Sequence, residues 1–271
     1  MRKIDYHMHT HFSADSEASP REHIEQAIAM GLDEICFTDH KDFEYPGCPF
    51  DLDANAYFAE LKSLQSEYAD KIKVKIGIEM GLDVEFQNEI EDFLNLHDYD
   101  YVIGSIHVIH QTEFYDPAQF FDGKSKEEAH REFFMNTLEC VKIFDCFNCL
   151  GHLDYICRYG PYEDKRVEHE KYQDIIDEIF KVLIQKGKGI EVNTSGYRER
   201  RTCGFPSFEQ VQRYYDLGGR IVTVGTDSHT SDRIGEHVEE VVKEYQRIGF
   251  DDVSTFTKRT RDVIINEHRE E

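Results

Sequence analysis

The chain contains no apolar run long enough to cross a membrane. None of its 271 residues belongs to a stretch near the roughly 18 consecutive apolar residues that a membrane helix needs. The first residues, MRKID, lead directly into a polar motif and lack the apolar centre of a signal peptide. We therefore expect a cytoplasmic protein that does not attach to membranes.

Positive charge is scarce. The sequence has 31 Lys and Arg against 55 Asp and Glu, which gives a formal net charge of −24. Such a chain repels the phosphates of nucleic acids and anionic membranes, so binding to either through broad electrostatic attraction is disfavoured. A phosphate-bearing substrate would need bound metal or a few well-placed arginines to reverse this field locally.

Cysteine is also infrequent, with seven residues scattered along the chain. An odd, scattered set is typical of reduced thiols in a cytosolic protein. Cys146 and Cys149 form one CxxC pair within an apolar run. A zinc knuckle or a redox pair needs more context than one such pair, so we interpret both residues as buried thiols.

The sequence lacks linkers, low-complexity segments and repeats, and instead alternates short β-rich runs with longer segments of helical apolar spacing. The candidate strands are residues 3–7, 34–38, 74–79, 101–105, 147–152, 189–193 and 220–225. This alternation predicts an α/β fold with parallel strands and helical crossovers. The length is usual for one α/β barrel.

Two helix starts carry recognisable capping signals. Ser19 followed by Glu22 predicts a capping box, and Gly31 is placed to end the same helix. Ser207 followed by Gln210 predicts a second capped start. Other helices are expected between the remaining strands.

Histidines and carboxylates stand at, or just past, the C-terminal ends of the candidate strands. They are His7, His9, Asp15, His40, Glu79, His107, His152, Asp227 and His229. In a parallel barrel these strand ends converge on one face, whereas an open sheet would not bring them together so readily. The set therefore favours a closed or nearly closed barrel with its active site at that face.

These residue types are suited to binding divalent metals. Neutral imidazole and carboxylate are ligands for Zn, Mn and Fe, and one carboxylate can bridge two ions. Because side chains alternate along a strand, His7 and His9 should point the same way, and the same argument applies to Asp227 and His229. A single histidine at a strand end is usually an ordinary polar residue, so the prediction of a metal site depends on the whole set.

The order and local sequence of these motifs resemble the PHP superfamily, the polymerase and histidinol phosphatase domains. The resemblance runs from His7 to His229 and includes the strings DYHMHT and GSIH. The run FSADS and the chain length are most similar to the histidinol-phosphate phosphatase branch. The resemblance implies one domain over residues 1–271, folded as a distorted seven-stranded TIM-like barrel.

The resemblance also implies two or three divalent ions, Zn, Mn or Fe, in three subsites. The first would use His7, His9, Glu79 and Asp227; the second Glu79 as a bridge with His107 and His152; and the third Asp15, His40 and His229. Many family members have a histidine where this chain has Asp15, a difference that can change the metal preference of the third subsite.

The implied activity is hydrolysis of a small phosphate monoester, L-histidinol phosphate, by a metal-activated hydroxide. Glu79 would bridge two ions, and either Asp227 or His229 would position the nucleophile or move a proton. The resemblance suggests Arg158 and Arg198 as a clamp for the phosphate, a task that suits the planar guanidinium. Arg200 and Arg201 compete with Arg198 for this role.

The segment 110–122 is rich in aromatic residues and follows the fourth strand, so it is expected either to form a wall of the substrate pocket or to pack as core.

Three other functions stay open. The chain could be another PHP phosphoesterase that acts on nucleotides, oligonucleotides or phosphotyrosine, a metal-dependent amidohydrolase, or a metal-binding module without catalysis. The sequence indicates neither the metal nor an oligomeric state.

Overall fold

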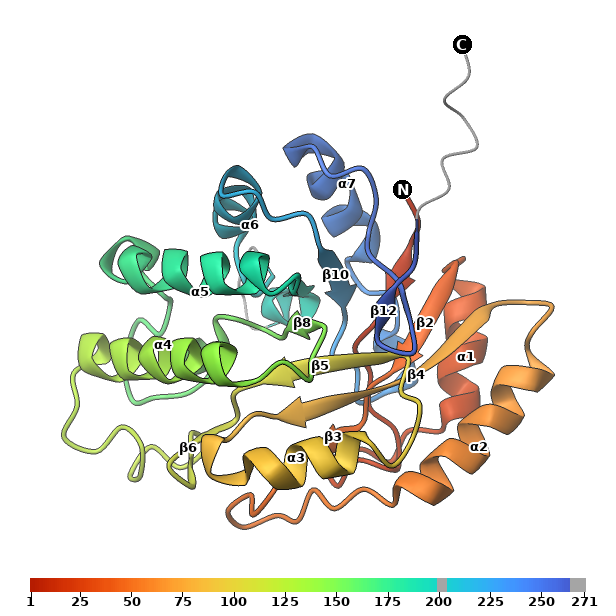
Figure 1. Ribbon diagram of the computed structural model, residues 1–271, viewed down its shortest axis with the longest axis horizontal. Coiled ribbons are helices and arrows are strands. Elements are labelled where there is room, and N and C mark those ends of the chain that lie inside the picture. Colours follow the sequence, from red (N-terminus) through yellow and green to blue (C-terminus); the bar gives the residue numbers. More distant parts are fainter. Residues whose placement is uncertain (199–203, 264–271) are drawn as a thin grey trace.

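Parallel strands form the centre of the computed structural model, which describes residues 1–198 and 204–263 (Figure 1). In spatial order they are β1 (Ile4–Asp5), β2 (Glu34–Phe37), β4 (Lys73–Gly81), β5 (Tyr101–Ser105), β8 (Cys149–Leu150), β9 (Gly189–Asn193) and β10 (Val222–Gly225). The short strand β3 (His40–Lys41) also pairs with β4. Phe37 pairs with Ile76 and His40 with Glu79, so β3 keeps the register of β2 and extends that strand.

Backbone hydrogen bonds join the first and last strands of this order. The N–H of Tyr6 donates to the carbonyl oxygen of Val224 over 2.9 Å. Further along the same seam, Asp227 donates to His7 over 2.7 Å and His9 donates to Ser228 over 2.8 Å. These bonds nearly close the sheet, which confirms the predicted seven-stranded barrel. The strands are shorter than expected at residues 3–7 and 147–152, where β1 and β8 have two residues each.

Seven helices among the described residues surround the strands in Figure 1. They are α1 (Pro20–Ala29), α2 (Ala54–Glu67), α3 (Gln87–Leu94), α4 (Lys126–Ile143), α5 (Gln173–Gln185), α6 (Phe208–Asp216) and α7 (Val238–Ile248). Single 3-10 turns are η1 (Val84–Phe86), η2 (Tyr155–Arg158), η3 (His169–Lys171), η4 (Thr194–Tyr197) and η5 (Ser231–Arg233). Each helix packs an apolar face on the sheet; in α5 this face includes Ile176, Ile179 and Leu183.

The two predicted capping boxes are not formed. Ser19 and Ser207 occupy the N-cap positions of α1 and α6, but neither side chain makes a capping hydrogen bond. The amide of Gln210 pairs instead with the amide of Gln173 on α5, so a tertiary contact replaces the local one. Gly31 does follow the end of α1 in a left-handed conformation, with φ of +68°, as expected.

Aromatic side chains fill the N-terminal end of the barrel. The hairpin formed by β11 (Phe256–Thr257) and β12 (Thr260–Arg261) places the ring of Phe256 5.1 Å from that of Tyr101. The ring of Tyr101 in turn lies 5.1 Å from that of Tyr6. This packing leaves the opposite, C-terminal end for polar side chains. A second hairpin, β6 (Val108–Ile109) and β7 (Thr112–Glu113), follows β5 on that side.

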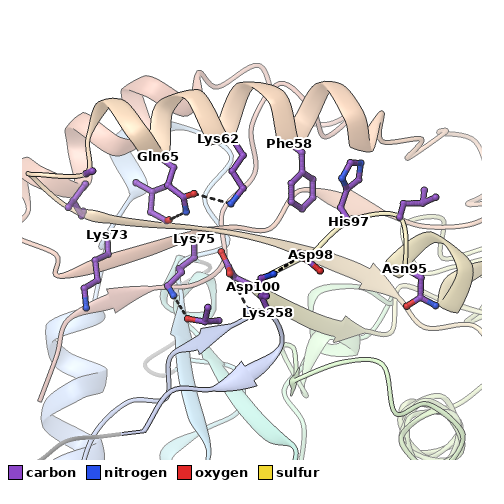
Figure 2. A pocket seen from close by; sticks show the side chains of 15 residues that line it. Phe58, Lys62, Gln65, Lys73, Lys75, Asn95, His97, Asp98, Asp100 and Lys258 are labelled. Carbon is purple, nitrogen blue, oxygen red and sulfur yellow. Dashed lines mark hydrogen bonds and ion pairs between the residues drawn. The ribbon is translucent and has the colours of Figure 1, made fainter.

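A groove of about 820 Å³ lies beside α2 and the N-terminal end of β4 (Figure 2). Lysines line it, but each of three is bonded within the groove. Figure 2 shows Lys62 bonded to Gln65, and Lys258 to Asp98, and Lys75 bonds to Thr257. None of the predicted site residues lines this groove, so the chemistry has to be sought at the other end of the barrel.

Within the described residues, no helix has both the length and the apolar character to span a bilayer.

Cys149 is buried on β8 and Cys146, three residues earlier, is half-buried. No disulfide joins the cysteines at positions 1–198, and Cys203 lies outside the described residues. Both CxxC residues are therefore thiols, as expected.

Candidate metal centre

Glu79 occupies the middle of the predicted ligand set. It lies near the C-terminal end of β4, the longest strand, and its carboxylate is fully buried. Oε1 is 2.8 Å from Nε2 of His152 and 3.2 Å from Nε2 of His107. Oε2 is 3.0 Å from both Nε2 of His7 and Nδ1 of His40. Four imidazoles from four parts of the chain thus surround one carboxylate, which has one oxygen facing each pair.

The side chains of His7 and His9 approach the same oxygen of Glu79, as the alternation of side chains along an extended chain predicts. Nε2 of His9 lies 3.4 Å from Oε2 of Glu79, the oxygen that also faces His7. Oδ1 of Asp227 approaches the same two rings, at 3.2 Å from Nε2 of His9 and 3.7 Å from Nε2 of His7. The structure therefore brings together the four residues expected in the first subsite.

Asp227 and His229 reach the site differently from the way the sequence suggested. Strand β10 ends at Gly225, and Asp227 adopts the left-handed backbone conformation with φ of +54°. The alternation argument is therefore wrong for this pair, because a turn and not a strand orients them. Nδ1 of His229 lies 3.1 Å from the backbone oxygen of Asp227, and its Nε2 lies 3.1 Å from Oδ2 of Asp15.

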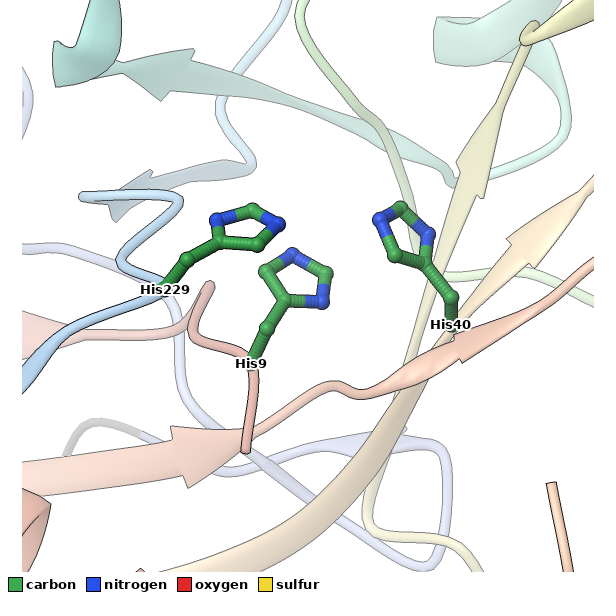
Figure 3. A group of neighbouring side chains, drawn as sticks. All are labelled: His9, His40 and His229. Atoms are coloured by element: carbon green, nitrogen blue, oxygen red, sulfur yellow. The ribbon is translucent and has the colours of Figure 1, made fainter. Parts of the chain in front are cut away.

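His9, His40 and His229 form a further group at the mouth of the site (Figure 3). The ring of His9 stacks on that of His40 at 4.2 Å and on that of His229 at 4.3 Å. Asp15 closes the group from outside, with Oδ2 3.7 Å from Nε2 of His40. The side chains of Asp15 and His229 are 41% and 31% exposed, so this subsite is the most open of the three.

Several buried polar atoms in this cluster have no hydrogen-bond partner. They are Nε2 of His7, Nε2 of His9, Nδ1 of His40 and Oε2 of Glu79. A buried polar atom without a partner costs about 1–3 kcal/mol, and such atoms rarely gather in one place without a reason. All four belong to groups whose ligand atoms lie within 4.8 Å of one another. The residues therefore fit a cluster of divalent ions.

The electrostatics agree with this interpretation. Burial alone would raise the pKa of Glu79, but the imidazoles of His7, His40 and His107 hold it well below its usual range. Burial lowers the pKa of His9 to about 4 and that of His40 to about 3. At neutral pH Glu79 is therefore ionised and His9 and His40 are neutral, the forms that bind metal, whereas the carboxylates Glu191 and Asp42 raise the pKa of His7 and of His107, respectively.

Two carboxylates that contact the ligands were missed in the sequence. Oδ1 of Asp42 lies 2.8 Å from Nδ1 of His107, and Oε1 of Glu191 lies 2.7 Å from Nδ1 of His7. The sequence contains a signal for each of these two carboxylates. Asp42 follows His40 by two residues, the spacing that keeps side chains on one face, and Glu191 is the charged residue of the buried strand β9.

Both predicted arginines lie next to Asp227. Nη2 of Arg158 donates to Oδ2 of Asp227 over 2.6 Å and also contacts the hydroxyl of Ser195. Arg198 donates through Nη1 to the backbone oxygen of Asp227 over 3.2 Å and through Nη2 to that of Thr226 over 2.8 Å. Arg200 and Arg201, the alternatives to Arg198, lie outside the described residues.

Three of the four aromatic rings in the segment 110–122 are buried. Phe114, Phe120 and Phe121 lie against one another, whereas Tyr115 is 79% exposed. Phe114 contacts the ring of Tyr155, which lies 4.6 Å from the ring of the predicted ligand His152. The buried rings thus support the site through Tyr155, while residues 115–119 face solvent.

Comparison with known proteins agrees with the geometry. The sequence model of the PHP domain family matches residues 5–195 of this chain. This chain belongs to the PHP domain family. A PHP relative from Lactococcus lactis subsp. lactis (strain IL1403), named histidinol-phosphatase, is 44% identical over 257 residues, which cover 95% of each chain. A relative from Clostridium acetobutylicum, named probable histidinol-phosphatase, is 33% identical over 89% of this chain and 91% of its own length.

A solved structure supports the same family and fold. It is the histidinol phosphate phosphatase of Lactococcus lactis subsp. lactis Il1403, described as a complex with zinc, L-histidinol and phosphate. It superimposes with a TM-score of 0.92 at 42% identity and covers 97% of this chain and 99% of its own. The similarity spans the whole barrel and confirms the family and the fold expected from the sequence.

Proposed function

We propose that this chain hydrolyses L-histidinol phosphate to L-histidinol and phosphate, a step of histidine biosynthesis. The observation that carries the proposal is the joint presence, at one end of the barrel, of a buried metal-type cluster around Glu79 and a guanidinium, that of Arg158, directly beside it. The similarity to histidinol-phosphatases over almost the full length supports the choice of substrate.

Three sets of residues would hold the ions. We assign His7, His9, Glu79 and Asp227 to the first subsite, Glu79, His107 and His152 to the second, and Asp15, His40 and His229 to the third. Bound divalent ions supply a water of lowered pKa and offset the charge of the phosphoryl oxygens. Zn, Mn and Fe all suit these ligands.

Arg158 and Arg198 bind the phosphoryl group in this proposal. Burial would lower the pKa of Arg158, but the neighbouring Asp227 raises it, so the guanidinium stays charged. Within the described residues, the contacts of Arg198 with Thr226, Asp227 and Glu236 involve three of its five N–H groups, and the other two would bind a phosphate oxygen. The two cations provide the local reversal of charge that a chain of net charge −24 requires.

We assign the orientation of the attacking water to Asp227. Burial would raise the pKa of Asp227, but Arg158 and His7 lower it well below its usual range, so the group is ionised and accepts hydrogen bonds. Its Oδ2, which faces Arg158, would orient the attacking water by accepting a hydrogen bond from it. Nδ1 of His229 faces the backbone oxygen of Asp227 and its Nε2 faces Asp15, so we keep His229 as a residue of the third subsite.

The test is phosphate release from L-histidinol phosphate, p-nitrophenyl phosphate and a mononucleotide, each with and without chelator. We expect a strong preference for L-histidinol phosphate, lost with chelator and restored by Zn or Mn. A preference for the mononucleotide would keep the metal chemistry and reject the substrate. Absence of turnover with all three esters in metal-loaded protein would reject catalysis.

A further inference from the structure

Two buried carboxylates lie behind the ligands, on the side away from Glu79. Asp42 contacts Nδ1 of His107, whose Nε2 faces Glu79. Glu191 contacts Nδ1 of His7, whose Nε2 also faces Glu79. Each imidazole is therefore held between an outer carboxylate and the central one.

This arrangement sets the tautomer of both rings once a metal is bound. Each outer carboxylate accepts a hydrogen bond from Nδ1–H, so Nε2, which faces Glu79, would be the nitrogen that presents its lone pair to an ion. An outer carboxylate also makes the imidazole a stronger base and restricts its rotation. Both effects favour metal binding at Nε2.

The two outer carboxylates differ in how many ligands they contact. Oε2 of Glu191 accepts a second hydrogen bond, over 3.1 Å, from the backbone N–H of His152. Glu191 thus contacts one residue of the first subsite, His7, and one of the second, His152. Oδ1 of Asp42 bonds to His107, and its Oδ2 is buried without a partner, 3.7 Å from Nδ1 of His40.

Two glycines make room for these carboxylates. A Cβ atom on Gly225 would lie 2.3 Å from Oε1 of Glu191 and 2.2 Å from Cβ of His7. A Cβ atom on Gly81 would lie 2.0 Å from Oδ1 of Asp42. Both distances are far below van der Waals contact. Any larger residue at either position would displace the carboxylate from its ligand.

We propose that Asp42 and Glu191 are positioning residues that set the tautomer and orientation of His107 and His7, and that Glu191 couples the first two metal subsites. The inference rests on the metal centre of the proposed function. It adds two residues that act through the ligands they contact.

Zinc titration of chelator-stripped protein by calorimetry tests the inference with Asp42→Asn and Glu191→Gln. Each amide keeps the size of the side chain and removes its charge. We expect zinc affinity to fall by about 10- to 100-fold, the usual effect of losing such a partner. The loss should affect one tightly bound ion in Asp42→Asn and two in Glu191→Gln.

Matched controls come from the other end of the barrel. Glu34→Gln and Asp100→Asn make the same changes at buried carboxylates near the N-terminal ends of the strands, and they should bind zinc like the parent. Equal affinity and stoichiometry in the parent and both test variants would overturn the inference alone. A parent that binds no zinc would overturn the proposed metal centre as well.

A second measurement separates positioning from a general effect on folding. Long-range ¹⁵N–¹H spectra of the zinc-loaded parent should show His7 and His107 protonated at Nδ1, and each variant should change the signals of its own histidine. Unchanged tautomers in both variants would overturn the inference. If Glu191→Gln does not fold, Glu191→Asp, which keeps the charge but draws it back from His7, is measured in the same way.

Discussion

Two buried glutamates on neighbouring strands, Glu79 of β4 and Glu34 of β2, have opposite electrostatic environments. Glu34 lies at the N-terminal end of the barrel, where burial raises the pKa of its carboxyl and the phenol of Tyr6 is its close partner. Glu79 lies at the C-terminal end, where surrounding imidazoles hold its pKa well below the usual range despite complete burial. Burial therefore decides the direction of the pKa shift at Glu34, whereas at Glu79 the neighbouring imidazoles outweigh burial.

The comparison extends to the whole of each end. At the N-terminal end, aromatic rings pack against one another, and carboxylates such as Asp100 accept hydrogen bonds from backbone N–H groups. At the C-terminal end, four buried ligand atoms have no hydrogen-bond partner. Other buried atoms without a partner, such as those of His130, Tyr99 and Ser254, lie outside this group, so it is the clustering of these four atoms around one carboxylate that points to metal.

The largest expected effect is the loss of activity in Glu79→Gln, compared with the activity of Glu34→Gln. Removing the charge at Glu79 takes away a ligand common to two subsites, and we expect activity to fall by about 1,000-fold or more, since metal catalysis contributes several kcal/mol. Glu34→Gln should leave kcat/KM within about threefold. Steady-state phosphate release with excess zinc measures both. Equal losses in the two variants would mean that Glu79 acts only through the fold.

The two arginines provide the next comparison. Arg158→Ala should lower kcat/KM by about 100- to 1,000-fold, because it removes a preorganised donor beside the reacting group. Arg198→Ala should raise KM by about tenfold, the effect of one hydrogen bond to a charged group, since Arg198 also contacts the backbone of residues 226 and 227. An unchanged KM in Arg198→Ala would reject its role in phosphate binding.

Alanine substitutions at two glycines then separate an effect on stability from an effect on metal binding. Gly225→Ala at the C-terminal end and Gly189→Ala at the N-terminal end both introduce a Cβ into a filled space, at 2.2 Å from His7 and 2.5 Å from Ile221. Each should cost about 1–3 kcal/mol of the free energy of unfolding, measured in urea. Only Gly225→Ala should also weaken zinc binding. Parent-like zinc affinity in Gly225→Ala would contradict the crowding around His7.

The smallest expected effect concerns His130 on α4, whose ring is buried against Tyr162 and Tyr172. Burial lowers its pKa from 6.5 to about 4. The unfolded chain therefore binds a proton first as pH falls, so this contribution is complete above pH 6.5 and is lost as pH falls towards 4. In metal-free protein, His130→Phe should reduce the loss of unfolding free energy between pH 7 and 5 by about 1–2 kcal/mol. An identical pH dependence in both proteins would show that His130 is not involved.

The structure brings the predicted ligand residues together, as the sequence suggested, because those residues follow strands at short, regular offsets. His7 and His9 follow the first strand and Glu79 ends the third, so the position of the strands was enough to place them on one face. The alternation argument failed at Asp227, where a left-handed residue interrupts the strand geometry. The predicted cap at Ser207 failed because Gln210 found a partner on another helix, a contact that local sequence does not specify.

The sequence by itself determined the alternation of strands and helices and the chemical types of residue at the strand ends, because periodicity and motif spacing act over neighbouring positions. Only the tertiary structure decided which of these side chains meet. Glu191 contacts His7 across 184 residues, and Asp42 contacts His107 across 65. Such pairs exist only after the barrel closes, since the chain itself does not fix which strand faces which across the interior.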